Sequence, residues 1–336
     1  MLWMASVLGL IAMGGMIFGD DADIVDEGGD DAQPNPSSPE PETALLDVQP
    51  TDSSSHTDDI LLGTADGDNL FGGDGSNQIN GYDGDDLLDG GSGGDHLYGG
   101  DGVDTVVGGD GADLMHGEAG SDQMLGGGDN DSLYGHFGND LLIGGDGTDI
   151  AHGGQDHDTL DGGNGNDALH GNYGDDTLMG GHGIDTLFGG VGNDLVSGAD
   201  DDESDFVNGG DGDDTIIFDR ADSVTGGAGA DDIRLDLHAE PTGLTGSASV
   251  SDFDRSEDVL TLFVETPEDV TMTVVNGVAD STVLIDGEVV LTVEGVTDLT
   301  TDDVTLGAYD DETAPIFDPT VAILENHAGS AIGGTA

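Results

Sequence analysis

The sequence predicts an all-β protein, a right-handed parallel β-roll solenoid of nonapeptide repeats followed by a small C-terminal β domain. Three observations predict this fold. Glycine and aspartate recur with a period of nine from residue 63 onward, and an aliphatic residue fills the eighth position of almost every period. After residue 234, glycine becomes rare and alternating runs of β-branched residues replace it, as in half-buried strands.

The charge of the chain bounds its partners. The 336 residues include 73 Asp and Glu but only 3 Lys and Arg, which gives a formal net charge of -70. Nucleic acid is excluded as a partner, because phosphate contacts require Lys or Arg. The acidic side chains need cations instead, and carboxylates with backbone carbonyls are the ligands that calcium prefers. With no cysteine, the chain has no disulfides and no thiolate zinc site.

Two stretches precede the repeats. Residues 1–18 are almost wholly apolar and predict a hydrophobic export or anchor segment, although a basic start and a small-residue cleavage site are missing. Residues 19–62 are acidic and hold five of the nine prolines, which predicts an extended linker. We therefore expect a secreted or cell-surface protein.

The repeat array occupies residues 63–234. Residues 63–197 form fifteen nonapeptides without a gap, for example GGDGVDTVV at 99–107. All fifteen begin with Gly, twelve have Gly at position four, fourteen have Asp at position six, and fourteen have Leu, Ile, Val or Met at position eight. The exceptions at positions six and eight are Asn77 and Ala151. Four further units, irregular in placement, follow up to residue 234.

This period predicts a coil of two units. We expect about three residues around position eight to form a short strand with one apolar side chain inward, and the preceding six to form a glycine-dependent turn. Eighteen residues then make one coil, and stacked coils give two parallel sheets across a thin core. The turns of units i and i+2 lie above one another, so acidic residues line each edge of the roll.

The pattern GGxGxDxUx resembles the hemolysin-type (RTX) repeat, a known calcium-binding nonapeptide. The resemblance implies multiple Ca²⁺ ions, about one per repeat gap, shared by the position-six side chains and backbone carbonyls of adjacent turns. Residues 63–197 carry 27 acidic residues, and thirteen filled gaps would bring 26 positive charges. The implied ligands are Asp68, Asn77, Asp86, Asp95, Asp104, Asp113, Asp122, Asp131, Asp140, Asp149, Asp158, Asp167, Asp176, Asp185, Asp194, Asp205, Asp214 and Asp231.

The two edges of the roll differ in sequence. Every even-numbered unit keeps Gly at position two, whereas Thr64, Tyr82, Glu118, His136 and Asn172 replace it in odd-numbered units only. Bulky side chains constrain the turn backbone whose carbonyls must bind the ion. We therefore expect the even-numbered row to bind calcium more tightly than the odd-numbered row.

Position nine of the even-numbered units carries an aromatic and histidine stripe, which consists of Tyr98, His116, Tyr134, His152, His170 and Phe188. One interpretation is cross-strand stacking that stiffens the sheet. Alternatives are a docking stripe for a glycan or a cell surface, or a minor Zn or Cu site at His152 and His170.

Residues 235–336 predict the C-terminal β domain. Its clearest signal is STVLIDGEVVLTV, in which Asp286 and Gly287 join two alternating runs and predict a hairpin with a type I′ turn. The segment SDFDRSEDVLTL at 251–262 resembles one that follows such arrays in type I-secreted proteins, which implies a secretion signal near the C-terminus and the type I machinery as a partner.

Among function classes, we expect a non-enzymatic calcium-binding protein that folds outside the cell. The chain has no H-E-x-x-H and no G-x-S-x-G motif. The alternatives are an adhesin or matrix protein that binds a glycan or surface through a face of the roll, and a non-catalytic remnant of an RTX enzyme or toxin.

Overall fold

The computed structural model describes residues 58–199, 203–237, 247–264 and 266–308. In this part of the chain all regular structure is β-strand, and no helix there is long and apolar enough to cross a membrane. The expected export segment 1–18 and almost all of the expected linker lie outside the described residues. The all-β parallel solenoid predicted from the repeats is confirmed.

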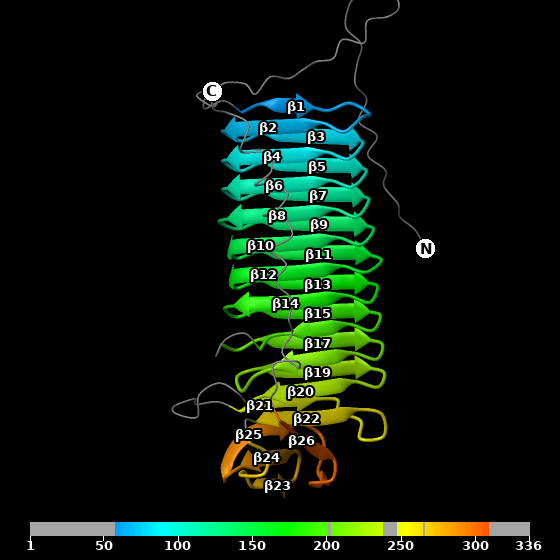
Figure 1. The fold of residues 1–336 in the computed structure, drawn as a ribbon. Helices are drawn as coiled ribbons and strands as arrows, with labels where there is room; N and C mark the ends of the chain where they lie inside the picture. The colour runs from blue at the N-terminus through cyan, green and yellow to red at the C-terminus, as the bar shows by residue number, and fades with distance from the viewer. Residues whose placement is uncertain (1–57, 200–202, 238–246, 265, 309–336) are drawn as a thin grey trace, which may run out of the picture. The chain divides into compact units, whose positions relative to one another are not determined.

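Two sheets form the solenoid, and Figure 1 shows their strands stacked in two columns. Sheet A contains, in spatial order, β1 (Ile60–Leu62), β3 (Gln78–Asp83), β5 (His96–Asp101), β7 (Leu114–Ala119), β9 (Ser132–Phe137), β11 (Ile150–Gln155), β13 (Ala168–Tyr173), β15 (Thr186–Val191), β17 (Phe206–Asp211), β19 (Ser223–Ala228), β21 (Ala248–Ser251), β25 (Glu288–Val293), β24 (Ser281–Ile285) and β23 (Met272–Asn276).

Sheet B contains β2 (Asn69–Asp74), β4 (Leu87–Ser92), β6 (Thr105–Asp110), β8 (Gln123–Gly128), β10 (Leu141–Gly147), β12 (Thr159–Gly165), β14 (Thr177–His182), β16 (Leu195–Ser197), β18 (Thr215–Phe218), β20 (Asp232–Asp236), β22 (Val259–Val264) and β26 (Val304–Ala308). Consecutive strands of the array therefore alternate between the two sheets, so each connection is one turn at an edge of the roll.

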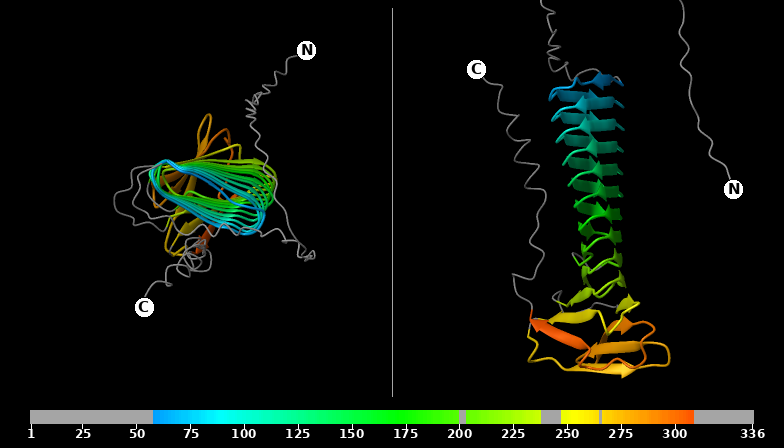
Figure 2. Two further views of the ribbon diagram at one scale, coloured as in Figure 1. Left: turned by 90° about the horizontal axis from the view of Figure 1, so that it is seen from above. Right: turned by 90° about the vertical axis from the view of Figure 1, so that its right-hand side faces the viewer.

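The register confirms a coil of eighteen residues. Leu142 of β10 pairs with Leu160 of β12, and Ala151 of β11 pairs with Leu169 of β13, all in parallel orientation. Seen along its axis, the roll is a flattened loop in which successive coils superimpose (Figure 2). Each side chain of the regular array thus lies directly above its equivalent eighteen residues earlier.

The strands are longer than the sequence predicted. A typical strand spans six residues, from position seven of one unit to position three of the next, as in β9 (Ser132–Phe137). Pairing continues through the glycine positions, where Gly154 is the register partner of both His136 and Asn172. The turn is therefore confined to positions four to six, and only its three residues leave the sheets.

The core consists of two facing rows of position-eight side chains, one from each sheet. These side chains have almost no exposed surface: Leu88, Leu97, Val106, Met115, Met124, Leu133, Leu142, Ala151, Leu160, Leu169, Leu178, Leu187 and Val196. Full burial of one such aliphatic side chain contributes about 1.5–3 kcal/mol. Each coil supplies only two of them, so the hydrophobic core is thin for the eighteen residues that it orders.

At both ends the sheets extend beyond the regular array. Strand β1 precedes residue 63 and pairs with β3, within a range that lacks the glycines of the repeat. At the other end, β21 and β22 continue the parallel ladders of sheets A and B across the expected boundary at residue 234. The array and the expected C-terminal domain therefore share two continuous sheets.

The last strands close the end of the roll. Strands β24 and β25 form the predicted antiparallel hairpin, and its loop residues Asp286 and Gly287 have φ of 53° and 88°, as a type I′ turn requires. Strand β23 adds an antiparallel edge to β24. Antiparallel pairing thus replaces the parallel ladder at this end of sheet A.

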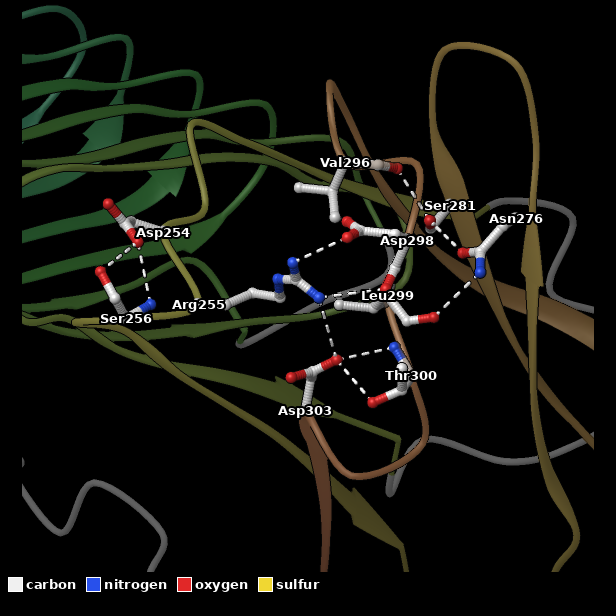
Figure 3. A network of polar contacts seen from close by, with 10 residues as sticks. All are labelled: Asp254, Arg255, Ser256, Asn276, Ser281, Val296, Asp298, Leu299, Thr300 and Asp303. Carbon is white, nitrogen blue, oxygen red and sulfur yellow. Dashed lines mark hydrogen bonds and ion pairs between the residues drawn. The ribbon is translucent and has the colours of Figure 1, made fainter.

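Figure 3 shows how Arg255, which lies between β21 and β22, contacts the loop between β25 and β26. Its guanidinium donates to the carbonyl and to Oδ2 of Asp298, both at 3.0 Å, and lies 3.6 Å from Oδ2 of Asp303. Asp303 Oδ2 also accepts from the backbone N–H and the hydroxyl of Thr300, each at 2.7 Å. These hydrogen bonds lower the pKa of Asp303. The arginine thus helps to fix the position of this loop, whose Leu299 is buried in the core.

Candidate metal sites along the roll

The position-six aspartates form a continuous chain of contacts along each edge. Oδ1 of Asp131 accepts a hydrogen bond of 2.8 Å from the backbone N–H of Asp113, one coil earlier, and the N–H of Asp131 donates to Oδ1 of Asp149 at 2.8 Å. The same contact to the preceding coil is made by Asp86, Asp95, Asp104, Asp113, Asp122, Asp140, Asp149, Asp158, Asp167, Asp176, Asp185, Asp194, Asp205, Asp214 and Asp231.

The second carboxylate oxygen has no hydrogen-bond donor in most of these residues. Buried Oδ2 atoms without a partner belong to Asp86, Asp95, Asp104, Asp113, Asp122, Asp131, Asp140, Asp149, Asp158, Asp167, Asp176, Asp194, Asp214 and Asp231. A buried unpaired charge is strongly unfavourable, so each of these atoms requires either a proton or a cation.

Burial raises the pKa values of these carboxyls. The pKa rises to about 7 for Asp104, Asp113, Asp122, Asp131, Asp140, Asp167 and Asp194, to about 8 for Asp158, and to about 6 for Asp176 and Asp214. Hydrogen bonds from the backbone oppose this effect but are the smaller cause, and neighbouring aspartates add to it. Without a bound cation, the folded roll therefore disfavours the ionised form of these carboxyls at neutral pH.

The glycine at position one shows what each Oδ2 faces. A Cβ added to Gly126 would lie 2.5 Å from Oδ2 of Asp131 and 2.6 Å from the carbonyl oxygen of Gly144, and the same holds for Gly144 with Asp149 and Gly162. Two acceptor oxygens thus approach the same point. A cation between them, or a proton on Oδ2, would satisfy both, and the glycine leaves space for an ion.

Asn77 provides a contrast within the same chain. Its Oδ1 accepts from the N–H of Asp59 at 3.0 Å, as the aspartates do, but Nδ2 stands in the place of Oδ2. This nitrogen donates to the carbonyl oxygens of Gly75 and Gly90, each at 3.2 Å. The amide hydrogens therefore do at Asn77 what a cation must do beside the aspartates. The repeat pattern predicts Asn77 as a calcium ligand together with the aspartates. At the place of their Oδ2 acceptor, however, its side chain has the Nδ2 donor.

The remaining predicted ligands continue the two rows with local differences. Asp68 lies at the half-buried start of its row, and its Oδ2 accepts from the backbone N–H of Thr64 at 2.6 Å and from the hydroxyl at 3.0 Å. Among the irregular units, Asp205, Asp214 and Asp231 keep the contact to the preceding coil.

Two residues that the sequence pattern missed occupy equivalent places. Asp222 Oδ1 accepts from the N–H of Asp205 at 2.9 Å, and Asp258 Oδ1 accepts from the N–H of Asp231 at 3.1 Å. Both stand two residues before a buried aliphatic residue, Val224 and Leu260. The shorter motif Asp-x-aliphatic, without its glycines, could have identified them.

We compared the repeat region with models of known protein families. The model of the RTX calcium-binding nonapeptide repeat matches residues 62–97, 98–133, 134–169, 170–202, 199–220 and 219–237, which together span more than half of the chain. The chain belongs to the RTX repeat family. Repeats of this family bind calcium. The comparison with curated proteins found no match.

The side chains of this RTX roll fit the ion. Calcium takes six to eight oxygen ligands at about 2.3–2.6 Å, from carboxylates and backbone carbonyls. Oδ2 of each position-six aspartate and the carbonyl of the position-one glycine of the next coil are such ligands. A bound Ca²⁺ would supply the positive charge between coils that the sequence, without lysine, does not.

The position-two residues of the odd-numbered units keep the glycine backbone. Tyr82, Glu118, His136 and Asn172 all have φ of 78–80°, a left-handed conformation that side chains rarely adopt, and equivalent Gly154 has φ of 128°. The backbone at position two therefore keeps a positive φ in spite of the substitutions. The tighter binding expected for the even-numbered row remains a prediction.

The position-nine stripe is a continuous stack of rings on sheet A. Neighbouring rings from Tyr98 to Phe188 lie 4.7–5.2 Å apart between centroids, with planes within 13° of parallel. Because sheet register places equivalent residues eighteen apart, the rings stack face to face, as in the cross-strand interpretation. Burial lowers the pKa values of His116, His152 and His170 and favours their neutral forms.

Proposed function

We propose that this protein is an exported calcium-dependent structural module whose β-roll forms when calcium binds outside the cell. In this proposal Ca²⁺ ions lie between successive coils on both edges, held by position-six aspartates and position-one glycine carbonyls. The observation that carries the proposal is the row of buried Oδ2 atoms that face carbonyl oxygens without a hydrogen-bond donor.

Folding and calcium binding form one equilibrium in this proposal. Each coil buries only two aliphatic side chains and also brings two carboxylates into a buried row, so the metal-free roll is poorly stabilised. An ion that binds only the folded state stabilises it by mass action. Extracellular calcium modules operate with dissociation constants of about 0.1–1 mM, so the chain would stay unfolded inside a cell and fold after export.

A calcium titration of the full-length chain followed by far-UV circular dichroism tests this proposal. We expect a steep cooperative gain of β-signal with calcium. We expect little gain with magnesium, because Mg²⁺ requires a compact octahedral site and gives up water reluctantly. A strong β-spectrum in chelator, unchanged by calcium, would contradict the proposal.

The roll itself is proposed to have no catalytic role. The RTX repeat and the solenoid fold are typically non-catalytic. The rings of the stripe stack on one another, and Oδ1 of a buried position-six aspartate such as Asp131 contacts the preceding coil while its Oδ2 remains available to an ion. This reading leaves calcium binding and interaction as the functions of the described residues.

A second candidate function is docking of a glycan or a cell surface on sheet A. The observation that favours it is a shallow groove beside the ring stack, lined among others by Tyr134, Phe137, His152, Asn172 and Tyr173. Phe137 and Tyr173 are 54% and 63% exposed there, although both are large aromatic residues. Exposed aromatic faces with neighbouring amides suit a sugar ring.

Glycan-array binding by the calcium-loaded protein tests this second function. Replacement of Phe137 and Tyr173 by Ser should abolish binding and leave the calcium-induced circular dichroism signal unchanged. The combined change Tyr98→Ala and Tyr134→Ala tests the stripe in the same way. Equal binding by all variants would exclude this face as the docking surface.

A further inference from the structure

A cluster of three metal-ligating side chains lies on sheet A, outside the aspartate rows. Nδ1 of His116 and Nε2 of His136 are 2.9 Å apart, and one ligand atom of each histidine and of Glu118 lies within 4.8 Å of the others. His116 and Glu118 belong to β7, and His136 is the register partner of Glu118 on β9. Adjacent parallel strands thus bring together residues eighteen and twenty apart.

We propose that His116, Glu118 and His136 form a binding site for a first-row transition metal ion of the Zn²⁺ class, separate from the calcium rows. Two imidazole nitrogens and one carboxylate are a ligand set typical of zinc and poorly suited to calcium, which prefers oxygen. Three protein ligands leave a fourth tetrahedral position open to water, as in zinc sites that bind a further ligand.

The backbone supports this assignment independently of the side chains. Glu118 and His136 occupy position two with φ of 79° and 80°, where glycine stands in other units of the same sheet, such as Gly100 and Gly154. Side chains in this left-handed region are strained, and such residues concentrate at functional sites. Two of the three ligands therefore come from positions at which the repeat itself favours glycine.

The two imidazoles share a hydrogen bond in the absence of metal, with their ring centroids 5.2 Å apart, and a bound ion would replace this bond. Two nitrogens bound to tetrahedral zinc at about 2.0–2.1 Å lie about 3.3 Å apart, slightly more than the 2.9 Å between His116 and His136. His116 is held from both sides, because its ring stacks on Tyr98 at 4.9 Å and on Tyr134 at 5.0 Å. Glu118 is exposed, so its carboxylate can turn toward an ion that arrives from solvent.

The pair predicted from the sequence, His152 and His170, lacks these features. Their rings stack in parallel at 4.7 Å, and within the described residues no third ligating side chain joins them in a metal-holding group. The structure thus moves the candidate transition-metal site by two coils along the same stripe. It also adds a carboxylate that position nine alone cannot supply.

Zinc titration of the full-length chain at saturating calcium tests the proposal, with binding measured by calorimetry and by the visible absorption of Co²⁺ as a substitute. We expect one site tighter than the background of acidic residues, with the absorption pattern of histidine-coordinated Co²⁺. His136→Gly removes one ligand and restores the residue typical of this position, so the roll should stay folded. Its matched control is Asn172→Gly, which makes the same change two coils away.

A second pair of variants tests the other histidine. His116→Phe removes the nitrogen but keeps a stacking ring, as Phe188 does at the equivalent position, and His170→Phe is its control. We expect His136→Gly and His116→Phe to weaken zinc binding by at least about tenfold, the lower range for loss of even an outer metal partner. The two controls should bind zinc as the unaltered protein does.

The opposite results would overturn the proposal. Equal zinc affinity in His136→Gly and Asn172→Gly would do so, and so would zinc binding that is lost as calcium rises, because the ion would then occupy the aspartate rows. The calcium-induced circular dichroism signal of each variant, measured in parallel, separates a lost zinc site from a lost fold. A failure of calcium-dependent folding would thus be recognised as a separate result.

Discussion

Nδ2 of Asn77 lies 3.2 Å from the carbonyl oxygen of Gly90 and donates a hydrogen bond to it. Thirteen residues separate the two, and the same spacing places Oδ2 of Asp131 beside the carbonyl oxygen of Gly144. One unit thus closes the gap between coils with an N–H group, whereas the others place two oxygens there. The difference of a single atom decides whether a cation is needed.

Asn77→Asp should create one additional calcium site. The change replaces the donor by Oδ2, which would face the carbonyl of Gly90 as the other aspartates face theirs. We expect the calcium stoichiometry to rise by one ion and the metal-free chain to become less structured. Equilibrium dialysis with calcium counts the ions directly. Asn69→Asp adds the same charge at an exposed position and should leave the stoichiometry unchanged.

Asp131→Asn is the reverse experiment in the middle of the array. The amide should donate to the carbonyl of Gly144 and remove a calcium ligand at once. We expect a loss of about one ion and a less cooperative calcium titration, with the chain still able to fold. Asp110→Asn, which changes an exposed carboxylate, serves as control. An unchanged ion count in Asp131→Asn would show that Oδ2 does not bind calcium.

Gly126→Ala should damage the same site through space instead of charge. Its Cβ would lie 2.5 Å from Oδ2 of Asp131 and 2.6 Å from the carbonyl of Gly144, so neighbouring atoms would have to move. Overpacking of this kind costs about 1–3 kcal/mol, and we also expect weaker calcium binding. Gly128→Ala is the control, because no atom lies within 4 Å of its added Cβ. Thermal unfolding of both variants, with and without calcium, would show whether Gly126→Ala alone loses stability and calcium binding.

The pKa shifts predict opposite effects of pH with and without calcium. Burial raises the folded-state pKa of Asp113 and Asp131 to about 7 and that of Asp158 to about 8, from an unfolded value of 3.8. At pH values between 3.8 and about 7 to 8, the folded metal-free roll therefore binds more protons than the unfolded chain. Its stability should therefore rise as pH falls from about 8 toward 4, and be lost as pH rises through 7 to 8.

With calcium present, protons compete for the same oxygens. The calcium concentration at the folding midpoint should increase as pH is lowered below about 7, because the carboxyls must release protons before they bind the ion. Circular dichroism at pH 5 and pH 8, in chelator and in calcium, measures both effects. If the chelated chain is equally unstructured at both pH values, the burial of these carboxyls does not govern its folding.

The two edges should remain distinguishable in solution. Position two is Gly throughout one row, while Tyr82 and Asn172 in the other row hold a left-handed backbone at φ of 79° and 78°. We expect two classes of calcium affinity in calorimetry. Substitution of both residues by Gly should narrow the difference between the classes. A single homogeneous class in the unaltered protein would contradict the expected inequality of the rows.

The sequence was sufficient to predict the coil and its core, because a nine-residue period constrains both. Aliphatic residues at position eight, such as Leu142 and Leu160, became register partners in a buried row, as eighteen-residue coils require. The length of the strands was not predicted. The glycines of the repeat predicted turns. Parallel pairing nevertheless continues through Gly154, because it depends on the strand of the adjacent coil and not on local propensity.

Contacts between coils were the part that sequence patterns could not supply. Strand β1 and Asp222 lack the glycines of the repeat. Both are nevertheless part of the roll, because an aliphatic residue stands at the spacing that the coil requires. The cluster around His116 joins position nine of one unit to position two of others. A search that compares equivalent positions cannot find such a group, because the strand path alone brings His136 beside it.

We propose that calcium binds between Oδ2 of a position-six aspartate and the glycine carbonyl of the next coil. A crystal structure of the full chain grown in calcium, with anomalous diffraction data, would locate the ions. We expect an anomalous peak about 2.3–2.6 Å from both Oδ2 of Asp131 and the carbonyl oxygen of Gly144. A folded roll without a calcium peak at these oxygens would show that the ion does not bind between the coils in this way.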